Sequence, residues 1–399
     1  MTSYSTEAGV REELAQLKAA LGGRELLDAA TKIKKEMDSL NNTTLHVALT
    51  GDSGVGKSSL VNALRGLPDF GDNAAETGVV QTTMEPKPYH HPRFPKVTFW
   101  DLPGIGTGDF KADTYLKLVN FSQYDFFIIV SNSRFSENVI KLACEIKKMK
   151  KTFYYVRSYI DVSIQSESKK PNFNETETLQ IIRKDCLTHL KKTGEDSPKV
   201  FLVSRHDLSK YDFPLLQKTL EEGLDDLKKL VLIMAWSTFS KDVIERKKDA
   251  MLGHIQKKSF LSCTIGMVPI PGLGLVCNIL ILKNTMEIIC KAFGLDEGSL
   301  CKLGDSTGIP VAELKSTIKK TPSINEITKQ FVINFLQKSM VTTALTAVEL
   351  VVDFIPGLGS LYGGVGSFLT TYYTLKFFLS DAVEDAENVL ATVCERKKN

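Results

Sequence analysis

The sequence predicts an α/β fold followed by a helical region, and two observations support this prediction. Strand-like segments recur along the first half of the chain, at residues 45–49, 96–104, 124–131, 152–156 and 199–205. From residue 231 onward the sequence is patterned as helix. A chain of 399 residues is also long enough for two domains, each with its own core.

We therefore expect three parts: an N-terminal helical segment at residues 1–42, an α/β domain at residues 43–230 and a C-terminal helical domain at residues 231–399. The first part holds two short helix-like stretches separated by glycines, and we expect it to pack on the C-terminal helices. The sequence Asp-Phe-Pro at residues 212–214 predicts the start of a helix that closes the α/β domain near Lys229.

A glycine-rich loop follows the first predicted strand. Its sequence, GDSGVGKS at residues 51–58, fits the phosphate-binding pattern G-x-x-x-x-G-K-[ST] at every fixed position. Glycines let backbone N–H groups converge on a phosphate without Cβ clashes. Because strand, loop and helix follow in the right order, a chance match is disfavoured. The predicted nucleotide-binding residues here are Gly51, Asp52, Ser53, Gly54, Val55, Gly56, Lys57, Ser58 and Ser59.

Two side chains of this loop carry the chemistry of a triphosphate site. Lys57 can reach the β- and γ-phosphates, and the Ser58 hydroxyl can ligate Mg²⁺. The predicted strand at residues 96–104 ends in a D-x-x-G motif, in which Asp101 can support the Mg²⁺ shell and the N–H of Gly104 can sense the γ-phosphate. Asp101 would equally suit an ATPase, so these motifs leave the base open.

Residues 76–83 form a polar loop with several hydroxyl groups. A threonine in such a loop closes onto Mg²⁺ and the γ-phosphate and releases them after hydrolysis. We favour Thr77, although spacing alone does not separate it from Thr82 or Thr83. The predicted metal ligands are therefore Ser58, Thr77 and Asp101.

The residue after Gly104 is Ile105, whose side chain can neither orient a water molecule nor accept a proton. Hydrolysis by an isolated subunit should therefore be slow, and a second subunit or a residue elsewhere must complete the site. Gln81 is the best local candidate to orient the water. The predicted catalytic residues are Lys57, Thr77, Gln81 and Gly104.

The base site is predicted after the strand at residues 152–156, where the chain reads Arg-Ser-Tyr-Ile-Asp. Guanine-specific proteins carry N/T-K-x-D there, and its aspartate accepts from guanine N1–H and the exocyclic amine, a pair of donors that adenine lacks. Asp161 has this spacing, whereas Tyr159 replaces the lysine and can instead cover a base face, which predicts altered rather than abolished affinity. The alternative, that Asp161 is a surface acid, stays open. The predicted base-site residues are Ser158, Tyr159, Asp161, Ser204 and Arg205, the last two where this fold offers backbone groups to guanine O6.

The composition limits which partners and which cellular compartment we expect for this protein. The net charge of +3 is too small to predict a nucleic-acid partner. Seven scattered cysteines without a C-x-x-C pair predict neither a disulfide framework nor a metal site and are typical of a reducing compartment. The N-terminus lacks a signal-peptide pattern, so we expect a cytoplasmic protein. His90 and His91 are expected at the surface rather than in a metal site, because no partner stands at ligand spacing.

A short motif occurs twice in the helical region, as PIPGLGL at residues 269–275 and as IPGLGSL at residues 355–361. Each stands between apolar arms and predicts a helical hairpin with a proline-glycine elbow. Two interpretations stay open. The hairpins can form the buried centre of a helical bundle, or they can contact a bilayer, into which arms shorter than about 20 apolar residues would insert only shallowly.

Several of these segments together resemble the interferon-inducible immunity-related GTPases, in the branch that retains Gly-Lys-Ser. The resemblance covers roughly residues 40–240 and rests on the phosphate loop, TGVV at 77–80, FWDLPGIG at 99–106 and YDFFII at 124–129. It implies a Ras-like P-loop G domain flanked by a helical domain built from the N- and C-terminal segments. It adds Thr77, Gly78, Val79, Val80 and Gln81 to the nucleotide site. The family's first-switch threonine falls on Thr77, a glutamate proposed for catalysis across its dimer falls on Gln81, and its base-site lysine falls on Tyr159.

The resemblance further implies cooperative GTP hydrolysis through nucleotide-dependent self-assembly and association with intracellular membranes. We therefore expect a GTPase that uses Mg²⁺, binds GTP and GDP, associates with itself or related GTPases through its G domain, and acts at intracellular membranes in cell-autonomous defence. The alternative, motivated by Ile105 and Tyr159, is a regulatory scaffold that binds guanine nucleotide with little turnover. Adenine specificity is a third possibility.

Overall fold

The computed structural model describes the greater part of the chain. The described residues are 35, 39–40, 42–70, 73–78, 85–105, 111–132, 136–194, 198–206, 208, 210–238, 240–266, 273–339 and 359–396, of which 264, 273–276 and 359–365 are described by their backbone alone. Among the predicted site residues, Val79, Val80 and Gln81 lie outside this set. So do the predicted N-terminal helices up to residue 34 and much of both proline-glycine elbows.

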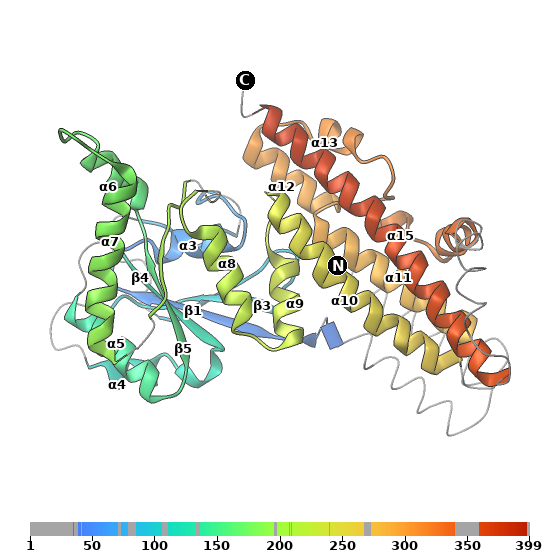
Figure 1. The fold of residues 1–399 in the computed structure, drawn as a ribbon, viewed down its shortest axis with the longest axis horizontal. Coiled ribbons are helices and arrows are strands. Elements are labelled where there is room, and N and C mark those ends of the chain that lie inside the picture. The colour runs from blue at the N-terminus through green and yellow to red at the C-terminus, as the bar shows by residue number, and fades with distance from the viewer. Residues whose placement is uncertain are drawn as a thin grey trace. The chain divides into compact units, whose positions relative to one another are not determined.

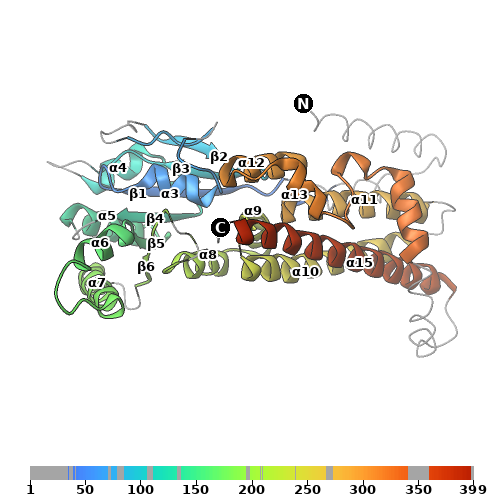
Figure 2. The same cartoon turned by 90° about the horizontal axis from the view of Figure 1, so that it is seen from above.

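The chain divides into two compact units (Figures 1 and 2). One unit comprises residues 1–42, 248–291 and 318–385, and the other comprises residues 43–247, 292–317 and 386–399. The domain boundaries expected from the sequence at residues 42 and 230 stay a prediction.

The second unit is built on a six-stranded sheet with the order β2-β3-β1-β4-β5-β6. Its strands are β1 (Leu45–Gly51), β2 (Lys87–His90), β3 (Val97–Asp101), β4 (Phe126–Ser131), β5 (Thr152–Arg157) and β6 (Val200–Leu202). All neighbours pair in parallel except β2, which runs antiparallel to β3 at the edge. The five apolar segments of the sequence are therefore the five parallel strands, and the polar strand β2 lies at the edge of the sheet.

Helices cover the sheet. They are α3 (Lys57–Leu64), α4 (Ala112–Leu118), α5 (Glu137–Lys148), α6 (Ile160–Glu167), α7 (Glu175–Leu190), α8 (Phe213–Glu222) and α9 (Asp226–Ala235). Side chains of α4 to α7 form one core cluster with alternate residues of the strands, such as Phe127 and Ile129 of β4. The intervening β4 residues Phe126 and Ile128 are buried as well, and α3, α8 and α9 contact β1, β3 or β6. A sheet buried on both faces explains why the strands read as continuous apolar runs.

The parallel arrangement positions the predicted motifs. The carboxyl ends of parallel strands meet at one edge of a sheet, where ligands bind in open α/β folds. The phosphate loop follows β1, the D-x-x-G motif follows β3 and Tyr159 follows β5. Motifs that are more than a hundred residues apart in the sequence therefore lie at one edge.

Two expectations were wrong in detail. The helix predicted to run from Asp212 towards Lys229 is two helices, since Gly223 ends α8 and the Asp225 side chain accepts from the N–H of Lys228 to start α9. His91 is not a surface residue but is 1% exposed, and its Nδ1 accepts from the backbone N–H groups of Arg93 and Phe94. It closes the turn between β2 and β3.

The helical part of the chain contains α10 (Lys241–Gly266), α11 (Leu273–Phe293), α12 (Glu297–Thr307), α13 (Val311–Thr317) and α15 (Gly359–Arg396). Figures 1 and 2 show α10, α11 and α15 running side by side. Ser262 of α10 joins them, because its hydroxyl lies 2.6 Å from Asn278 Oδ1 on α11 and 2.9 Å from Thr371 Oγ1 on α15. Within the described residues, no helix has the length and apolar character needed to cross a bilayer.

Candidate nucleotide-binding site

The glycine positions of the phosphate loop are required by the backbone. Gly51 has a φ of 137°, and a Cβ atom there would stand 2.0 Å from the carbonyl oxygen of Val130. Gly54 and Gly56 also have positive φ, at 74° and 86°. L side chains rarely adopt this conformation, so the glycines let the loop turn tightly against β4 and lead into α3.

Lys57 is the first residue of α3 and is 7% exposed. Its Nζ donates to the carbonyl oxygens of Asp52 at 2.9 Å and Gly51 at 3.3 Å, so the ammonium group lies across the loop. Burial lowers the pKa of Lys57, and the charges of Asp101 and Asp52 oppose that shift. A buried cation held mainly by carbonyl oxygens at the start of a helix is well suited to an anionic ligand.

Ser58 and Asp101 come together next to Lys57. The Ser58 hydroxyl donates to Asp101 Oδ2 at 2.5 Å, and Asp101 is 1% exposed. A hydroxyl and a buried carboxylate oxygen are ligands of the kind that Mg²⁺ prefers. These two residues, 43 positions apart in the sequence, therefore fit the metal that the motifs imply.

The D-x-x-G segment runs directly alongside the phosphate loop. The N–H of Leu102 donates to Leu49, and the N–H of Ile105 donates to Gly51, at 3.0 and 3.1 Å. At Gly104 a Cβ atom would stand 3.0 Å from the backbone of Ser53. Only a glycine allows this approach, which keeps the Gly104 amide close to the loop.

Ile105 turns its side chain away from the site. It is 2% exposed and belongs to the core cluster with Leu102 and Tyr115. The Tyr115 hydroxyl donates to the carbonyl of Pro103 at 2.8 Å and lies 3.0 Å from Thr50 Oγ1. The core therefore holds the D-x-x-G segment from behind and provides no water-orienting group at position 105.

Neighbouring strand ends support the phosphate loop. The hydroxyl of Ser158, which is 8% exposed, lies 2.7 Å from the carbonyl oxygen of Val55. The Ser136 hydroxyl lies 3.3 Å from Asp52 Oδ1. Burial raises the pKa of Asp52, while the Ser136 hydrogen bond and the Lys57 charge lower it. Ser158, predicted for the base site, thus contacts the phosphate loop through its side chain.

The predicted base-site acid stands at the start of α6. Tyr159 is the N-cap of α6 with a φ of 53°, and its ring lies against Gly56, where a Cβ atom would stand 3.2 Å from Cε2. Asp161 follows in the first turn of the helix. Its Oδ1 is buried and has no hydrogen-bond partner among the described residues. A buried acceptor without a donor is costly, and the N1–H and amine of guanine are donors that would satisfy it.

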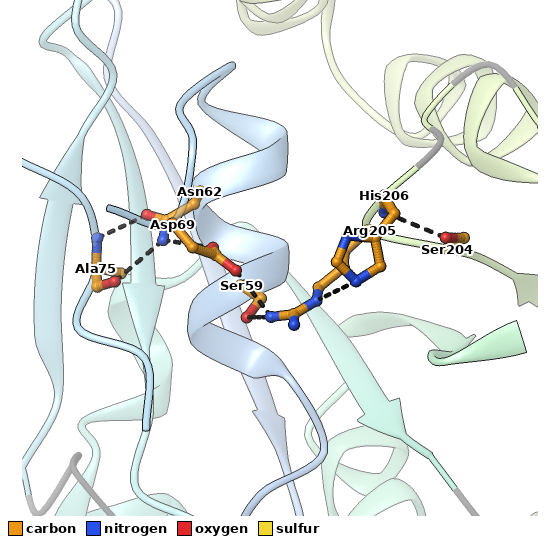
Figure 3. Close-up of polar contacts among 7 residues, drawn as sticks. All are labelled: Ser59, Asn62, Asp69, Ala75, Ser204, Arg205 and His206. Atoms are coloured by element: carbon orange, nitrogen blue, oxygen red, sulfur yellow. Dashed lines mark hydrogen bonds and ion pairs between the residues drawn. The ribbon is translucent and has the colours of Figure 1, made fainter. Parts of the chain in front are cut away.

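Ser204 and Arg205 follow β6 (Figure 3). Ser204 is 1% exposed, and its hydroxyl accepts from the N–H of His206. The guanidinium of Arg205 lies 5.7 Å from the centre of the Tyr159 ring and donates to Ser59 Oγ and Asp69 Oδ2. Arg205 is therefore engaged with protein side chains beside the predicted base site.

Thr77 and Gly78 are exposed and follow Ala75, whose backbone is held by Asn62.

Sequence analysis missed Asn62, Asp69 and Tyr115, whose contacts shape the site. Asn62 and Tyr115 lie at buried positions of helices, and their side chains form hydrogen bonds that no local pattern reveals. The described residues contain no group of three or more His, Cys, Asp and Glu side chains that could hold a metal ion.

Comparison with known proteins shows the family of this chain. The family model for interferon-inducible GTPases matches residues 10–393. Interferon-inducible GTPase 5 of Bos taurus is 37% identical over 391 residues, covering 98% of this chain and 84% of that protein. Interferon-gamma-inducible GTPase 10 of Mus musculus is 33% identical, covering 95% of this chain and 89% of that protein.

Solved structures resemble the chain more remotely. Toc33 from Arabidopsis thaliana in complex with Mg²⁺ and GMPPNP has 15% identity and a TM-score of 0.32, covering 45% of this chain and 79% of that one. The G domain of the T. maritima FeoB iron transporter has 23% identity and a TM-score of 0.28, covering 45% and 99%. The family match extends over nearly the whole sequence. The chain therefore belongs to the interferon-inducible GTPase family, and it is a GTPase.

Proposed function

We propose that this GTPase binds GTP with Mg²⁺ at the edge of the sheet, hydrolyses it to GDP, and assembles in its GTP-bound state on intracellular membranes in cell-autonomous innate immune defence. The observation that carries the nucleotide part is the convergence of the buried residues Lys57 and Asp101 with the partly buried Ser58 in one cluster. An immune role is supported by the family to which the chain belongs.

Each residue of the cluster has a distinct proposed role. Lys57 places its charge on the β- and γ-phosphates, and the loop amides around Gly54 and Gly56 donate to the same oxygens. Ser58, Asp101 and Thr77 would hold Mg²⁺, which supplies charge neutralisation at the phosphates when bound. Gly104 offers its amide to the γ-phosphate. These interactions position the triphosphate and stabilise charge that develops during hydrolysis.

Guanine is the proposed base because of Asp161. Its buried Oδ1 has no hydrogen-bond donor among the described residues. An adenine ring would leave this oxygen without a donor. Tyr159, two residues before Asp161, carries an aromatic ring against which the Arg205 cation lies. Ser158 and Ser204 stay proposed as neighbours that shape the loops, the former through its contact with Val55.

Self-assembly is proposed because Ile105, the residue after Gly104, cannot orient the attacking water. Ile105 belongs to the core, and the remaining local candidate, Gln81, lies outside the described residues. A second subunit, either another copy or a related GTPase, would complete the site, with Gln81, Val79 and Val80 in the contact region. The same observation favours the alternative function, a regulatory scaffold with little turnover of its own.

Measuring phosphate release against protein concentration, with GTP and ATP side by side, tests the proposal. Specific activity that rises with concentration and depends on GTP and Mg²⁺ is the expected result. A flat line near zero would favour the regulatory scaffold, and equal competition by ATP would overturn guanine specificity.

A substitution of Lys57 tests the site assignment. Lys57→Ala should abolish GTP binding, because the substitution removes a cation that the loop carbonyls already hold in place. Titration with a fluorescent GTP analogue measures the loss. The control is Lys170→Ala, which removes an exposed lysine paired with Glu167 and should bind like the wild type. Unchanged affinity in Lys57→Ala would contradict the assignment.

Membrane association is proposed through the apolar hairpins around residues 269–275 and 355–361. Phe260, near the end of α10, is 64% exposed, and its ring lies 5.0 Å from that of Phe368. Liposome flotation with GTP, with GDP and without nucleotide tests this part. No flotation in any state would favour the interpretation of the hairpins as bundle core.

A further inference from the structure

A continuous set of hydrogen bonds joins the loop after β6 to the segment after α3 (Figure 3). Arg205 Nη1 lies 2.8 Å from Ser59 Oγ and 2.8 Å from Asp69 Oδ2. The other carboxylate oxygen of Asp69, Oδ1, accepts from Asn62 Nδ2 at 3.0 Å. Asn62 in turn holds Ala75. The sequence separations range from 7 to 146 residues, so the set exists only in the folded chain.

Asn62 fixes Ala75 through both halves of its amide group. Nδ2 donates to the carbonyl oxygen of Ala75 at 3.0 Å, and Oδ1 accepts from the N–H of Ala75 at 2.6 Å. Both residues are fully buried. Because a buried amide that loses its partners pays a full desolvation cost, this two-way bond holds the backbone of Ala75 against α3.

Thr77 stands only two residues beyond Ala75. Two residues of extended chain span at most about 7 Å, so the position of Ala75 limits where the Thr77 hydroxyl can reach. Fixing Ala75 therefore removes much of the freedom that Thr77 would otherwise lose on closing over a γ-phosphate.

Asp69 connects the loop after β6 to Asn62, because each of its carboxylate oxygens accepts from a different partner. The Arg205–Asp69 pair is charge-assisted and partly buried, with side-chain exposures of 35% and 18%. The Arg205 guanidinium also lies 5.7 Å from the centre of the ring of Tyr159, two residues before Asp161 in the chain. A base bound there would contact the loop that carries Arg205.

We propose that Arg205, Asp69 and Asn62 are positioning residues that couple occupation of the base site to the placement of Ala75 and Thr77. This inference rests on the proposed binding of guanine nucleotide. A guanine base that fixes the conformation of the loop after β6 also fixes the side chain of Arg205. Through its hydrogen bonds, Arg205 then fixes Asp69, and Asp69 fixes Asn62, which holds the backbone of Ala75. A triphosphate without its correct base then positions Thr77 poorly even when its phosphates are bound.

The substitution Asp69→Asn breaks one bond of this set, the one between Asp69 and Arg205. The carboxamide oxygen can still accept from Asn62, but its amine would face the guanidinium of Arg205, which has only donors. The chain offers a closely matched control, Asp212→Asn. Asp212 pairs with Arg183 at 2.6 Å with exposures of 36% and 16%, and it also accepts from the N–H of Leu202. Both variants remove the negative charge from one comparable arginine–aspartate pair, but only Asp69→Asn must break a bond, because Arg183 and the N–H of Leu202 donate to the same oxygen of Asp212.

Hydrogen–deuterium exchange of the peptide that contains Ala75 is the first readout. GDP should protect this amide in the wild type, whereas pyrophosphate, which lacks a base, should protect it much less. In Asp69→Asn the GDP-induced protection should fall about ten-fold while GDP still binds, the size expected for one charge-assisted bond. Asp212→Asn should keep the protection.

Steady-state hydrolysis supplies the second readout. Asp69→Asn should lower kcat about ten-fold with a smaller change in KM, because Thr77 acts on the transition state more than on GTP binding. Arg205→Ala should lower kcat similarly, and combining it with Asp69→Asn should add little, since both cut the same bond. Equal unfolding midpoints for Asp69→Asn and Asp212→Asn would show that stability is not the cause.

The outcomes separate this inference from the function on which it rests. A wild-type protein that binds no GDP would remove the proposed function itself. If the wild type binds and hydrolyses GTP, but Asp69→Asn keeps its GDP-induced protection or Asp212→Asn loses it equally, the coupling is wrong and the bonds only brace the loop.

Discussion

Asp161 lies in the first turn of α6, two residues after the N-cap Tyr159, and one of its carboxylate oxygens is buried. A carboxylate accepts from two donors at once, whereas a carboxamide offers one acceptor and one donor group. Exchanging one for the other keeps the size of the side chain and reverses half of its hydrogen-bonding character. The identity of the preferred base should change with it.

Asp161→Asn should weaken GTP binding about ten-fold or more and strengthen binding of xanthosine triphosphate, which carries a carbonyl where guanine carries its amine. Competition between the two nucleotides for a fluorescent analogue measures the change. Asp113→Asn, an exposed aspartate in the first turn of α4, is the control and should keep the preference for GTP. Loss of both affinities without a change of preference would contradict base recognition by Asp161.

At the scale of an element, α4 supports the D-x-x-G segment through one hydroxyl. Tyr115 Oη contacts Pro103 and Thr50, and burial strongly raises the pKa of Tyr115, so this hydroxyl is protonated at neutral pH. Pro103 immediately precedes Gly104, whose amide is proposed to meet the γ-phosphate. We therefore expect the helix to act on a bound nucleotide through the backbone of the D-x-x-G segment.

Tyr115→Phe should lower the free energy of unfolding by about 1 kcal/mol and weaken binding of a non-hydrolysable GTP analogue several-fold more than that of GDP. Chemical denaturation and two nucleotide titrations provide the measurements. Tyr124→Phe is the matched control, because its buried hydroxyl donates at 2.8 Å to the carbonyl of Val119, which lies outside the D-x-x-G segment. It should cost similar stability without discriminating between the two nucleotides.

At the scale of the whole molecule, each compact unit buries a neutral histidine. His254 of α10 is 5% exposed, and burial together with the charges of Lys258 and Lys257 lowers its pKa to about 3. The pKa of His91 in the other unit is also lowered, chiefly by burial and then by Arg93. Both groups take up protons in the unfolded chain near pH 6.5 but not in the folded one.

Because the folded pKa is depressed, the stability contribution of His254 is complete above pH 6.5 and is lost as the pH falls towards 3. His254 alone should make the free energy of unfolding about 1 kcal/mol lower at pH 5.5 than at pH 7. Urea unfolding at both pH values checks this for the wild type and for His254→Leu, which should show a smaller difference. An unchanged difference in the variant would contradict the assignment of this slope to His254.

Much of the G domain was predictable because its patterns are local. Buried strands read as apolar runs, and a glycine-rich loop between strand and helix has few physical explanations. The division of the closing helix into α8 and α9 and the burial of His91 were not predictable, since Asp225 and His91 act on the backbone through hydrogen bonds rather than by any periodicity.

The same contrast holds for the site. Lys57, Ser58, Asp101 and Gly104 follow from short motifs, and the contact of Ser58 with Asp101 confirms that the motifs meet. Their proposed roles with nucleotide stay predictions. Asn62 and Asp69 belong to no sequence motif, because they act through hydrogen bonds to other residues, namely Ala75 and Arg205.

By itself, the sequence determined that this chain carries a glycine-rich loop of the phosphate-binding pattern and that it resembles the interferon-inducible GTPases, because these properties depend on residue types at fixed, short spacing. Only the tertiary structure decided that Ile105 belongs to the core and that Arg205, Asp69 and Asn62 form one set of hydrogen bonds. Contacts between residues far apart in the sequence depend on how strands and loops pack, and no local pattern specifies that packing.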